Sequence, residues 1–186
     1  WTSLVGSSED DDAWAITIGL DGSVYIAGET LGNLDGQINN GYNDAFISKF
    51  SADGEKQWTR LVGSSEDDDA WAITTGLDGS VYIAGETQGN LDGQTNSGDD
   101  DVFISKFSAD GEKQWTKLFG SSEGDGAALL TSGLEGSINI FYSTWVADGD
   151  IGMQIYMSNF FDDANSINEN IQSGSIIANL STNDAN

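Results

Sequence analysis

The sequence predicts an all-β chain of four-stranded antiparallel blades in tandem, as in a β-propeller, and three observations predict it. The 186-residue chain repeats itself with a period of 57 residues, so that Trp1, Trp58 and Trp115 are equivalent. Each repeat contains short runs of β-branched and aromatic residues between tight-turn signals. No stretch with a helical period of useful length occurs before residue 160. A fixed period with four strands per unit is typical of a propeller blade, and a β-solenoid is the main rival.

The repeats divide the chain into four parts. Residues 1–57 and 58–114 differ at only eight positions, residues 115–171 form a divergent third copy, and residues 172–186 form a C-terminal tail. Propellers have about four to eight blades, so three blades predict an incomplete or open propeller.

The first repeat contains all the expected elements in order. Strands are expected at 13–18, 23–30, 45–51 and 56–62, and a long polar loop at 31–43. Asp-Gly pairs between the first two and the last two strands supply the positive φ of tight hairpins. The first three strands are apolar on both faces, which predicts that neighbouring blades cover them on both sides. The fourth strand carries Thr59 and Arg60 and is expected at the outer edge.

The third repeat requires a shorter loop. Strands are expected at 127–132, 137–143 and 155–161, and the fourth within 168–178.

The chain opens in the outer strand of a blade whose other three strands are missing. These candidate assembly residues are Trp1, Thr2, Ser3, Leu4, Val5 and Gly6. Unpaired strands and uncovered blade faces attract partners. Two partners remain open: further blades of a longer chain, or a second copy bound head to tail in a ring or filament.

One block of the chain resembles a known family. The motifs WTRLVGSSEDDDAW, DGSVYIAGET, DVFISKF and DGEKQW are similar to the bacterial SBBP-type β-propeller repeats. The resemblance covers residues 1–142. It implies a tandem array in a secreted or cell-surface protein, with no catalytic activity shared by the family.

Composition excludes several functions. Six Lys and Arg against 31 Asp and Glu give a net charge of −25, which argues against nucleic acid and anionic membranes as partners. No apolar run is long enough to insert in a membrane. The chain has no His and no Cys, which excludes imidazole bases, thiol nucleophiles and disulfides. Four lysines, Lys49, Lys56, Lys106 and Lys113, are expected to offset acids on an exposed edge.

Two acidic elements are candidate Ca²⁺ sites, because crowded carboxylates and amide oxygens suit a hard cation. The first is the acidic run before the first strand of a blade, and the second is the long loop, with oxygen side chains at alternate positions. A solvated turn and a self-satisfied Asx-rich loop are the alternatives. The candidates of the run are Asp10, Asp11, Asp12, Asp67, Asp68 and Asp69, and those of the loop are Asp35, Asn39, Asp92 and Asn96.

The sequence therefore predicts a non-catalytic, extracellular or cell-surface structural protein that self-associates or belongs to a longer array. The alternative is a lectin-like or protein-binding module that uses loops 31–43 and 88–100. Sugars stack on aromatic rings, and Trp14, Trp71 and Trp145 suggest a glycan partner, although packing between blades accounts for Trp14 and Trp71 as well.

Overall fold

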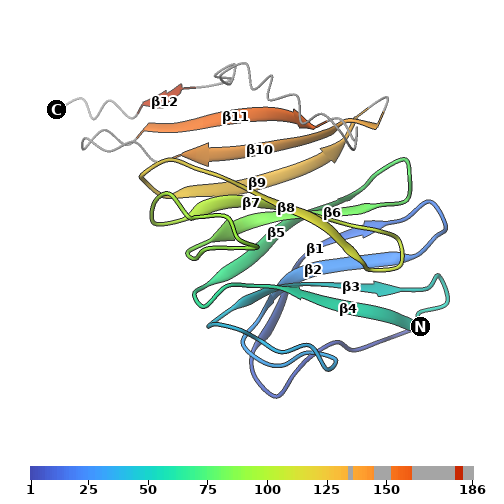
Figure 1. The fold of residues 1–186 in the computed structure, drawn as a ribbon. Helices are drawn as coiled ribbons and strands as arrows, with labels where there is room; N and C mark the ends of the chain where they lie inside the picture. The colour runs from blue at the N-terminus through green and yellow to red at the C-terminus, as the bar shows by residue number, and fades with distance from the viewer. Residues whose placement is uncertain (134–135, 145–151, 161–178, 182–186) are drawn as a thin grey trace.

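A computed structural model describes residues 1–133, 136–144, 152–160 and 179–181, and it confirms the all-β prediction. The strands form three antiparallel sheets that stack as open, propeller-like blades and do not close into a ring (Figure 1). In this described part of the chain, no helix has the length and hydropathy needed to cross a membrane.

Each blade follows the order of its strands in the sequence. Blade 1 contains β1 (Asp11–Ile18), β2 (Val24–Thr30), β3 (Asp44–Phe50) and β4 (Lys56–Val62). Blade 2 contains β5 (Asp68–Thr75), β6 (Val81–Thr87), β7 (Asp101–Phe107) and β8 (Lys113–Phe119). Blade 3 contains β9 (Asp125–Ser132), β10 (Ile138–Thr144), β11 (Gly152–Phe160) and the short β12 (Asn179–Ser181). The fourth strand expected within 168–178 lies outside the described residues.

The hairpins form where the Asp-Gly pairs are. Gly22 and Gly54 have φ values of 80° and 85°, which residues with a side chain rarely adopt. Asp21 also accepts a hydrogen bond from the amide of Ser23. These local signals fix the register of the antiparallel pairs.

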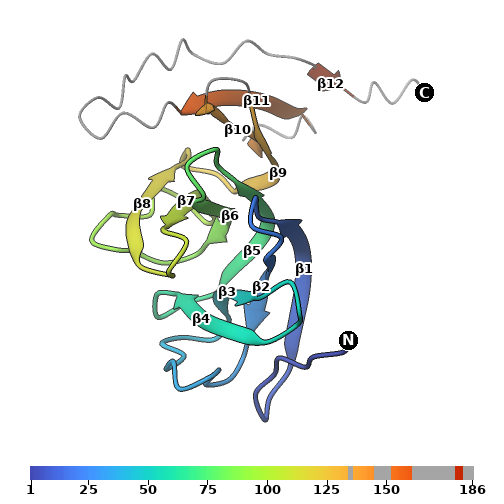
Figure 2. The ribbon, with the colours of Figure 1, turned by 90° about the vertical axis from the view of Figure 1, so that its right-hand side faces the viewer.

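The core lies between blades. The first strands of the blades are adjacent, with β1 against β5 and β5 against β9 (Figure 2). Tyr25 and Ile47 of blade 1 belong to one cluster with Ile83 and Phe103 of blade 2. A second cluster joins blades 2 and 3. The inner strands of blade 2, β6 and β7, are therefore buried on both faces, as their sequence predicts.

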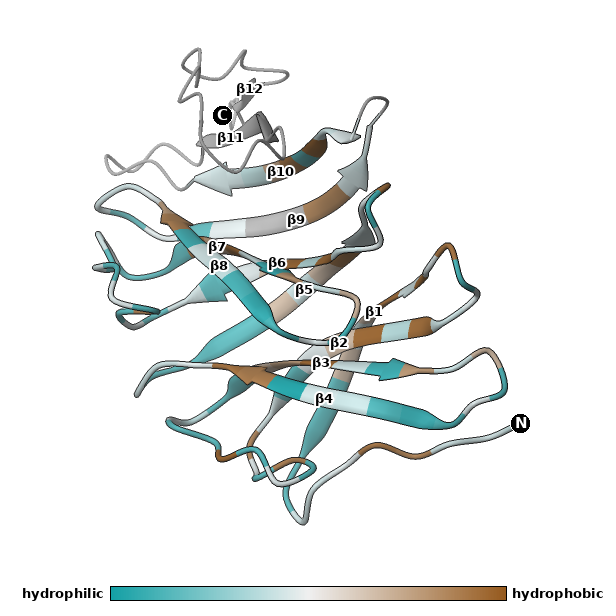
Figure 3. Cartoon of the chain, turned by 45° about the vertical axis from the view of Figure 1, so that its right-hand side comes forward, coloured by the Kyte–Doolittle hydropathy of each residue, from teal (hydrophilic) through white to brown (hydrophobic). Residues whose placement is uncertain are grey.

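The fourth strands lie at the outer edge of the stack. Lys56 and Gln57 at the start of β4 are exposed, and β4 and β8 carry hydrophilic stretches in Figure 3. Two of the four lysines differ from expectation, because Lys49 and Lys106 are buried. Each forms an ion pair with the hairpin acid of its own blade, Asp21 or Asp78, at 3.5 and 3.2 Å. The buried ammonium groups are thus paired, as a low-dielectric interior requires.

Residues 1–6 do not form the expected strand, and no described strand pairs with them. They nevertheless lie where the outer strand of a preceding blade would lie. The Trp1 indole donates to the carbonyl of Ala52 at 3.0 Å, and the equivalent Trp58 of β4 donates to Ala109, one repeat further on, at 3.2 Å. The Trp1 ring also stacks on Phe50, with 6.3 Å between centroids.

Candidate functional site

Blade 1 has one uncovered face, which we call the open face and which consists of Ala13, Ile16, Val24 and Ile26. Ile16 is 69% exposed, whereas the equivalent Ile73 of blade 2 is 9% exposed. The equivalents of the other three, Ala70, Val81 and Ile83, are fully buried.

Blade 1 covers these residues of blade 2 with a face that includes Tyr25, Ala27, Ala45 and Ile47. The near-identical repeats therefore show directly what the open face lacks: another blade packed against it.

The second feature is a pair of carboxylates at each junction between blades. At junction 1, Asp44 opens β3 of blade 1 and Asp68 opens β5 of blade 2. The amide of Asp68 donates to the carbonyl of Asn43 at 2.9 Å, which brings the two strand starts together. Junction 2 repeats this arrangement with Asp101 and Asp125, and the amide of Asp125 donates to Asp100 at 2.7 Å.

The four junction carboxylates are buried and incompletely satisfied. Each is at most 1% exposed. In each, Oδ2 accepts a main-chain N–H, from Asn40, Ser64, Ser97 and Ser121 respectively. The buried Oδ1 of Asp44, Asp101 and Asp125 has no hydrogen-bond partner, whereas Asp68 also interacts with the Thr87 hydroxyl. An unpaired buried oxygen is costly, so this pattern in three side chains requires a physical explanation.

A glycine follows the outer strand at each junction and makes room for the carboxylates. A Cβ on Gly63 would lie 2.1 Å from the Asp44 carboxylate. A Cβ on Gly120 would lie 2.2 Å from Oδ1 of Asp101 and 3.1 Å from Oδ2 of Asp125. Both carboxylates of junction 2 therefore border the same glycine.

Burial and mutual repulsion change the acidity of these groups. Burial is the main cause that raises the pKa of Asp44 to about 6, and the charge of Asp68 adds to it. Burial also raises the pKa of Asp125, with the charges of Asp101 and Asp100 contributing. The folded chain therefore holds like charges close together at a low dielectric, where they repel strongly.

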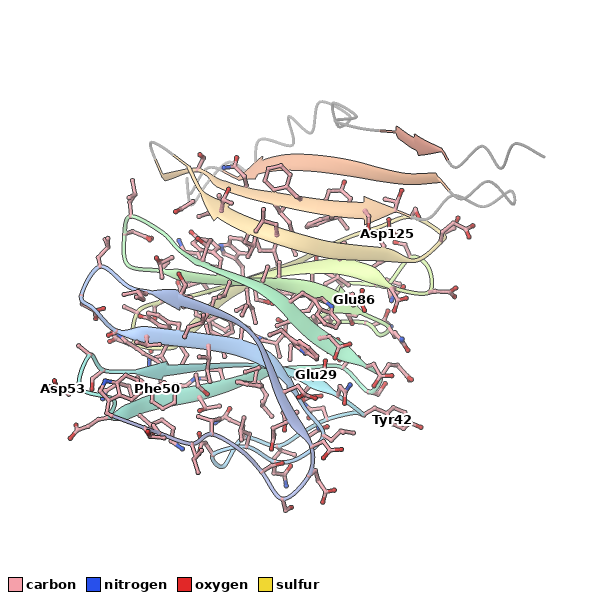
Figure 4. The ribbon with its side chains drawn as sticks, turned by 180° about the vertical axis from the view of Figure 1, so that it is seen from behind. Glu29, Tyr42, Phe50, Asp53, Glu86 and Asp125 are labelled. Atoms are coloured by element: carbon pink, nitrogen blue, oxygen red, sulfur yellow. The ribbon has the colours of Figure 1, made fainter. Side chains whose placement is uncertain are left out.

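A third acidic group lies beside junction 1. Burial, a hydrogen bond to Glu29 and the charges of Glu29 and Glu86 raise the pKa of Asp69 to about 8. Figure 4 shows Glu29, Glu86 and Asp125 near one end of the strands, and Phe50 and Asp53 near the other end. The buried carboxyl groups thus concentrate at one end of the blade stack.

The acidic run of the repeats divides among different roles. Asp11 and Asp68 are capped by Ser7 and Ser64, but Oδ1 of Asp11 accepts the Thr30 hydroxyl, so it is not unpaired. The other residues of the run do not share one arrangement. The main-chain carbonyl of Asp10 accepts the amide of Leu31, and the side chain of Asp12 is exposed. The carboxylate of Asp67 accepts the main-chain amide of Asn43, and Asp69 contacts Glu29.

The long-loop candidates do not act together. Asp35 pairs with Lys56 and accepts the Thr59 hydroxyl at 2.5 Å, and Asp92 repeats this with Lys113 and Thr116. The side-chain amides of Asn39 and Asn96 instead donate to the main-chain carbonyls of Thr30 and Thr87, the last residues of β2 and β6. Throughout the described residues, no group of three or more acidic side chains is arranged to hold a metal ion by itself.

The aromatic residues are engaged in packing. Trp14 and Trp71 of adjacent blades contact each other at 5.2 Å between centroids, although Trp14 is half-exposed. A shallow depression borders Trp58, but its ring is already in contact with Tyr25 and with the Arg60 guanidinium. Trp145 lies outside the described residues.

Sequence reasoning missed Asp44 and Asp101. The available signal was a carboxylate at the start of an otherwise largely apolar strand, DAFISKF or DVFISKF, repeated at the same position. The partner carboxylate lies in a different repeat, so its proximity depends on how the blades stack.

These features define a class, the protein of stacked four-stranded blades that do not close into a ring, and comparisons with known proteins add one relative. The chain is similar to the regulatory protein FlaEY of Caulobacter vibrioides, with 30% identity over 136 residues. The match covers 65% of this chain but only 14% of FlaEY, so the chain spans a small part of that relative. No family model matches the chain.

One solved structure is a further match. A protein of unknown function from Bacteroides caccae matches 93% of this chain and 62% of its own, with a TM-score of 0.43 and 9% identity. A likeness at this level carries no argument about function.

Proposed function

We propose that this chain is a non-catalytic structural module that assembles by stacking blades head to tail. In this arrangement, blade 3 of a second copy covers the open face of blade 1. The assembly is of the SBBP type that the repeat motifs resemble, and an extracellular or cell-surface location is part of the proposal. The regulatory role named for FlaEY is not carried over, because the shared part is 14% of that protein.

The observation that carries the proposal is the difference between equivalent isoleucines. Ile16 and Ile73 occupy the same position in nearly identical repeats, yet one is 69% and the other 9% exposed. Among the described residues, the main difference between their surroundings is the face of blade 1 that covers Ile73. An apolar face that another copy of the same unit already covers within the chain is suited to the same kind of contact between chains.

The N-terminal segment supports a blade-sized partner. Trp1 binds blade 1 through Ala52 and Phe50 in the way that Trp58 binds blade 2 through Ala109. The incoming blade then needs to supply only its first three strands, and residues 1–6 lie at the position of its outer strand. This is a form of strand addition between copies.

Blade 3 presents the complementary end. Leu130, Ile138 and Ile140 face blade 2, so Leu129 and Phe141, which pair with each other, lie on the opposite face. Leu129 is 49% exposed. The short β12 pairs with only the first residues of β11, Gly152 to Gln154. Leu129 thus gives the outer face of blade 3 an exposed apolar side chain, which can contact the open face in a heterologous arrangement.

Size-exclusion chromatography with light scattering tests the proposal over a range of protein concentrations. We expect the mass to rise with concentration, Ile16→Asp to give monomers, and Ile38→Asp to behave as wild type. Ile38 is the matched control, because it is 71% exposed in the long loop, outside the open face. A wild-type chain that stays monomeric, or association that Ile16→Asp leaves unchanged, would contradict the proposal.

A further inference from the structure

We propose that each junction between blades binds one hard divalent cation, with Asp44 and Asp68 as ligands at junction 1 and Asp101 and Asp125 at junction 2. The inference concerns the contacts within one chain and does not depend on association between copies.

The first argument is the state of the Oδ1 atoms. Each carboxylate uses Oδ2 for a main-chain N–H, which orients the side chain. At each junction at least one buried Oδ1 is left without a partner, that of Asp44 at junction 1 and those of Asp101 and Asp125 at junction 2. Buried charges in proteins are paired or coordinate metals. The chain has only six Lys and Arg. Four of them form ion pairs with acids outside the junctions, namely Lys49, Lys56, Lys106 and Lys113.

The second argument is the repetition of the site together with its absence from blade 1. Asp11 occupies the strand position of Asp68 and Asp125, but the described residues place no second strand-start carboxylate beside it. Asp11 and Asp68 interact in the same way with the hydroxyls of Thr30 and Thr87, whereas Oδ1 of Asp44, Asp101 and Asp125 has no partner. The unpaired oxygens of these strand-start acids thus occur where two described blades meet.

The chemistry fits Ca²⁺ or Mg²⁺, both of which prefer carboxylate oxygen and complete their coordination with carbonyl oxygens or water. The two carboxylates of a junction supply only part of such a coordination shell. The described residues contain no group of three or more acidic side chains that could hold the ion without carbonyl oxygens or water. A further carboxylate lies near each junction, Asp67 at junction 1 and Asp100 at junction 2. Both junctions therefore have an additional negative charge that favours a cation.

Isothermal titration of the chelator-treated, dialysed chain with CaCl₂, and separately with MgCl₂, tests the inference and distinguishes the two ions. We expect two ions per wild-type chain, one for Asp44→Asn, one for Asp101→Asn and none for the double variant. Asp11→Asn is the matched control and should keep both sites.

Thermal unfolding provides a second measurement that does not depend on the heat of binding. We expect CaCl₂ to raise the wild-type Tm above its value in EDTA, and NaCl at equal ionic strength to have a smaller effect. The double variant should be at least as stable as wild type in EDTA, because Asn is similar in size and removes two buried charges, and it should not respond to CaCl₂.

Three results would overturn the inference. One is no saturable binding of either ion by the wild-type chain. Another is binding that persists in the double variant, which would place the ion elsewhere on the acidic surface. The third is a Tm that depends on pH in EDTA but not on CaCl₂, which would mean that the paired carboxyl groups share a proton instead of a metal ion.

Discussion

The open face makes a quantitative prediction, because the repeats provide the same substitution in two environments. Ile73→Ala removes a side chain that is 9% exposed and belongs to the core between blades 1 and 2. Substitutions of this type in a core cost about 2–5 kcal/mol of the free energy of unfolding, because they remove buried apolar surface and leave a cavity. We expect about 3 kcal/mol.

Ile16→Ala is the matched substitution, at a side chain that is 69% exposed. Only about a third of the apolar surface is lost from a buried environment and no closed cavity forms, so we expect about 1 kcal/mol or less. The intrinsic preference of Ile over Ala for a strand affects both variants equally and cancels in the comparison.

Urea denaturation followed by tryptophan fluorescence measures both values, at a protein concentration low enough to keep the chain monomeric. The expected difference is about 2 kcal/mol. If copies associate through the open face, the cost of Ile16→Ala should increase with protein concentration, while that of Ile73→Ala should stay nearly constant. Equal costs at low concentration would refute the assignment of an uncovered face.

Three further predictions use other contacts. Gly63→Ala should lower the free energy of unfolding in urea by about 2 kcal/mol, because its Cβ would lie 2.1 Å from the buried Asp44 carboxylate. Gly6→Ala should have little effect, since the nearest contact of its Cβ is at 3.4 Å. Trp1→Ala should cost about 1 kcal/mol in the same assay through loss of its ring contact and hydrogen bond; no change would mean that residues 1–6 are detached in solution. Burial favours the neutral form of Asp35, yet hydrogen bonds from Lys56 and Thr59 hold its pKa below the ordinary 3.8. The charged form of Asp35 therefore stabilises the fold above pH 3.8, and this stabilisation is lost as the pH falls through the folded pKa. Acid unfolding should accordingly show a weaker pH dependence in Asp35→Asn.

Local signals in the sequence account for most of the fold. Asp-Gly pairs predict the hairpins, and the runs AWAITI and SVYIAGET predict strands whose bounds agree with the structure to within two residues. The apolar character of both strand faces also predicts stacking. These properties belong to one repeat, so one repeat is enough to read them.

Contacts between residues that are distant in sequence could not be read in this way. The sequence suggested an exposed edge for Lys49, because a lysine in a strand is usually solvated, but stacking buries it beside Tyr25 and Asp21. The spacing of the long-loop acids suggested alternating Ca²⁺ ligands, but Asp35 forms an ion pair with Lys56 of β4. In both cases the partner is distant in sequence and is placed by the blade geometry.

The same reasoning explains why the junction carboxylates carry more information than the acidic surface. A net charge of −25 predicts general repulsion, which ordinary salt screens for exposed groups. Buried carboxylates that meet only when two blades stack are screened far less, so their repulsion opposes stacking directly. A cation bound between them would therefore connect neighbouring blades, and its loss should loosen the contact between blades before it affects the hairpins within a blade. Hydrogen exchange in EDTA should accordingly increase first at the amide of Asp68, which donates across junction 1, and later at amides within β6, which pair inside blade 2.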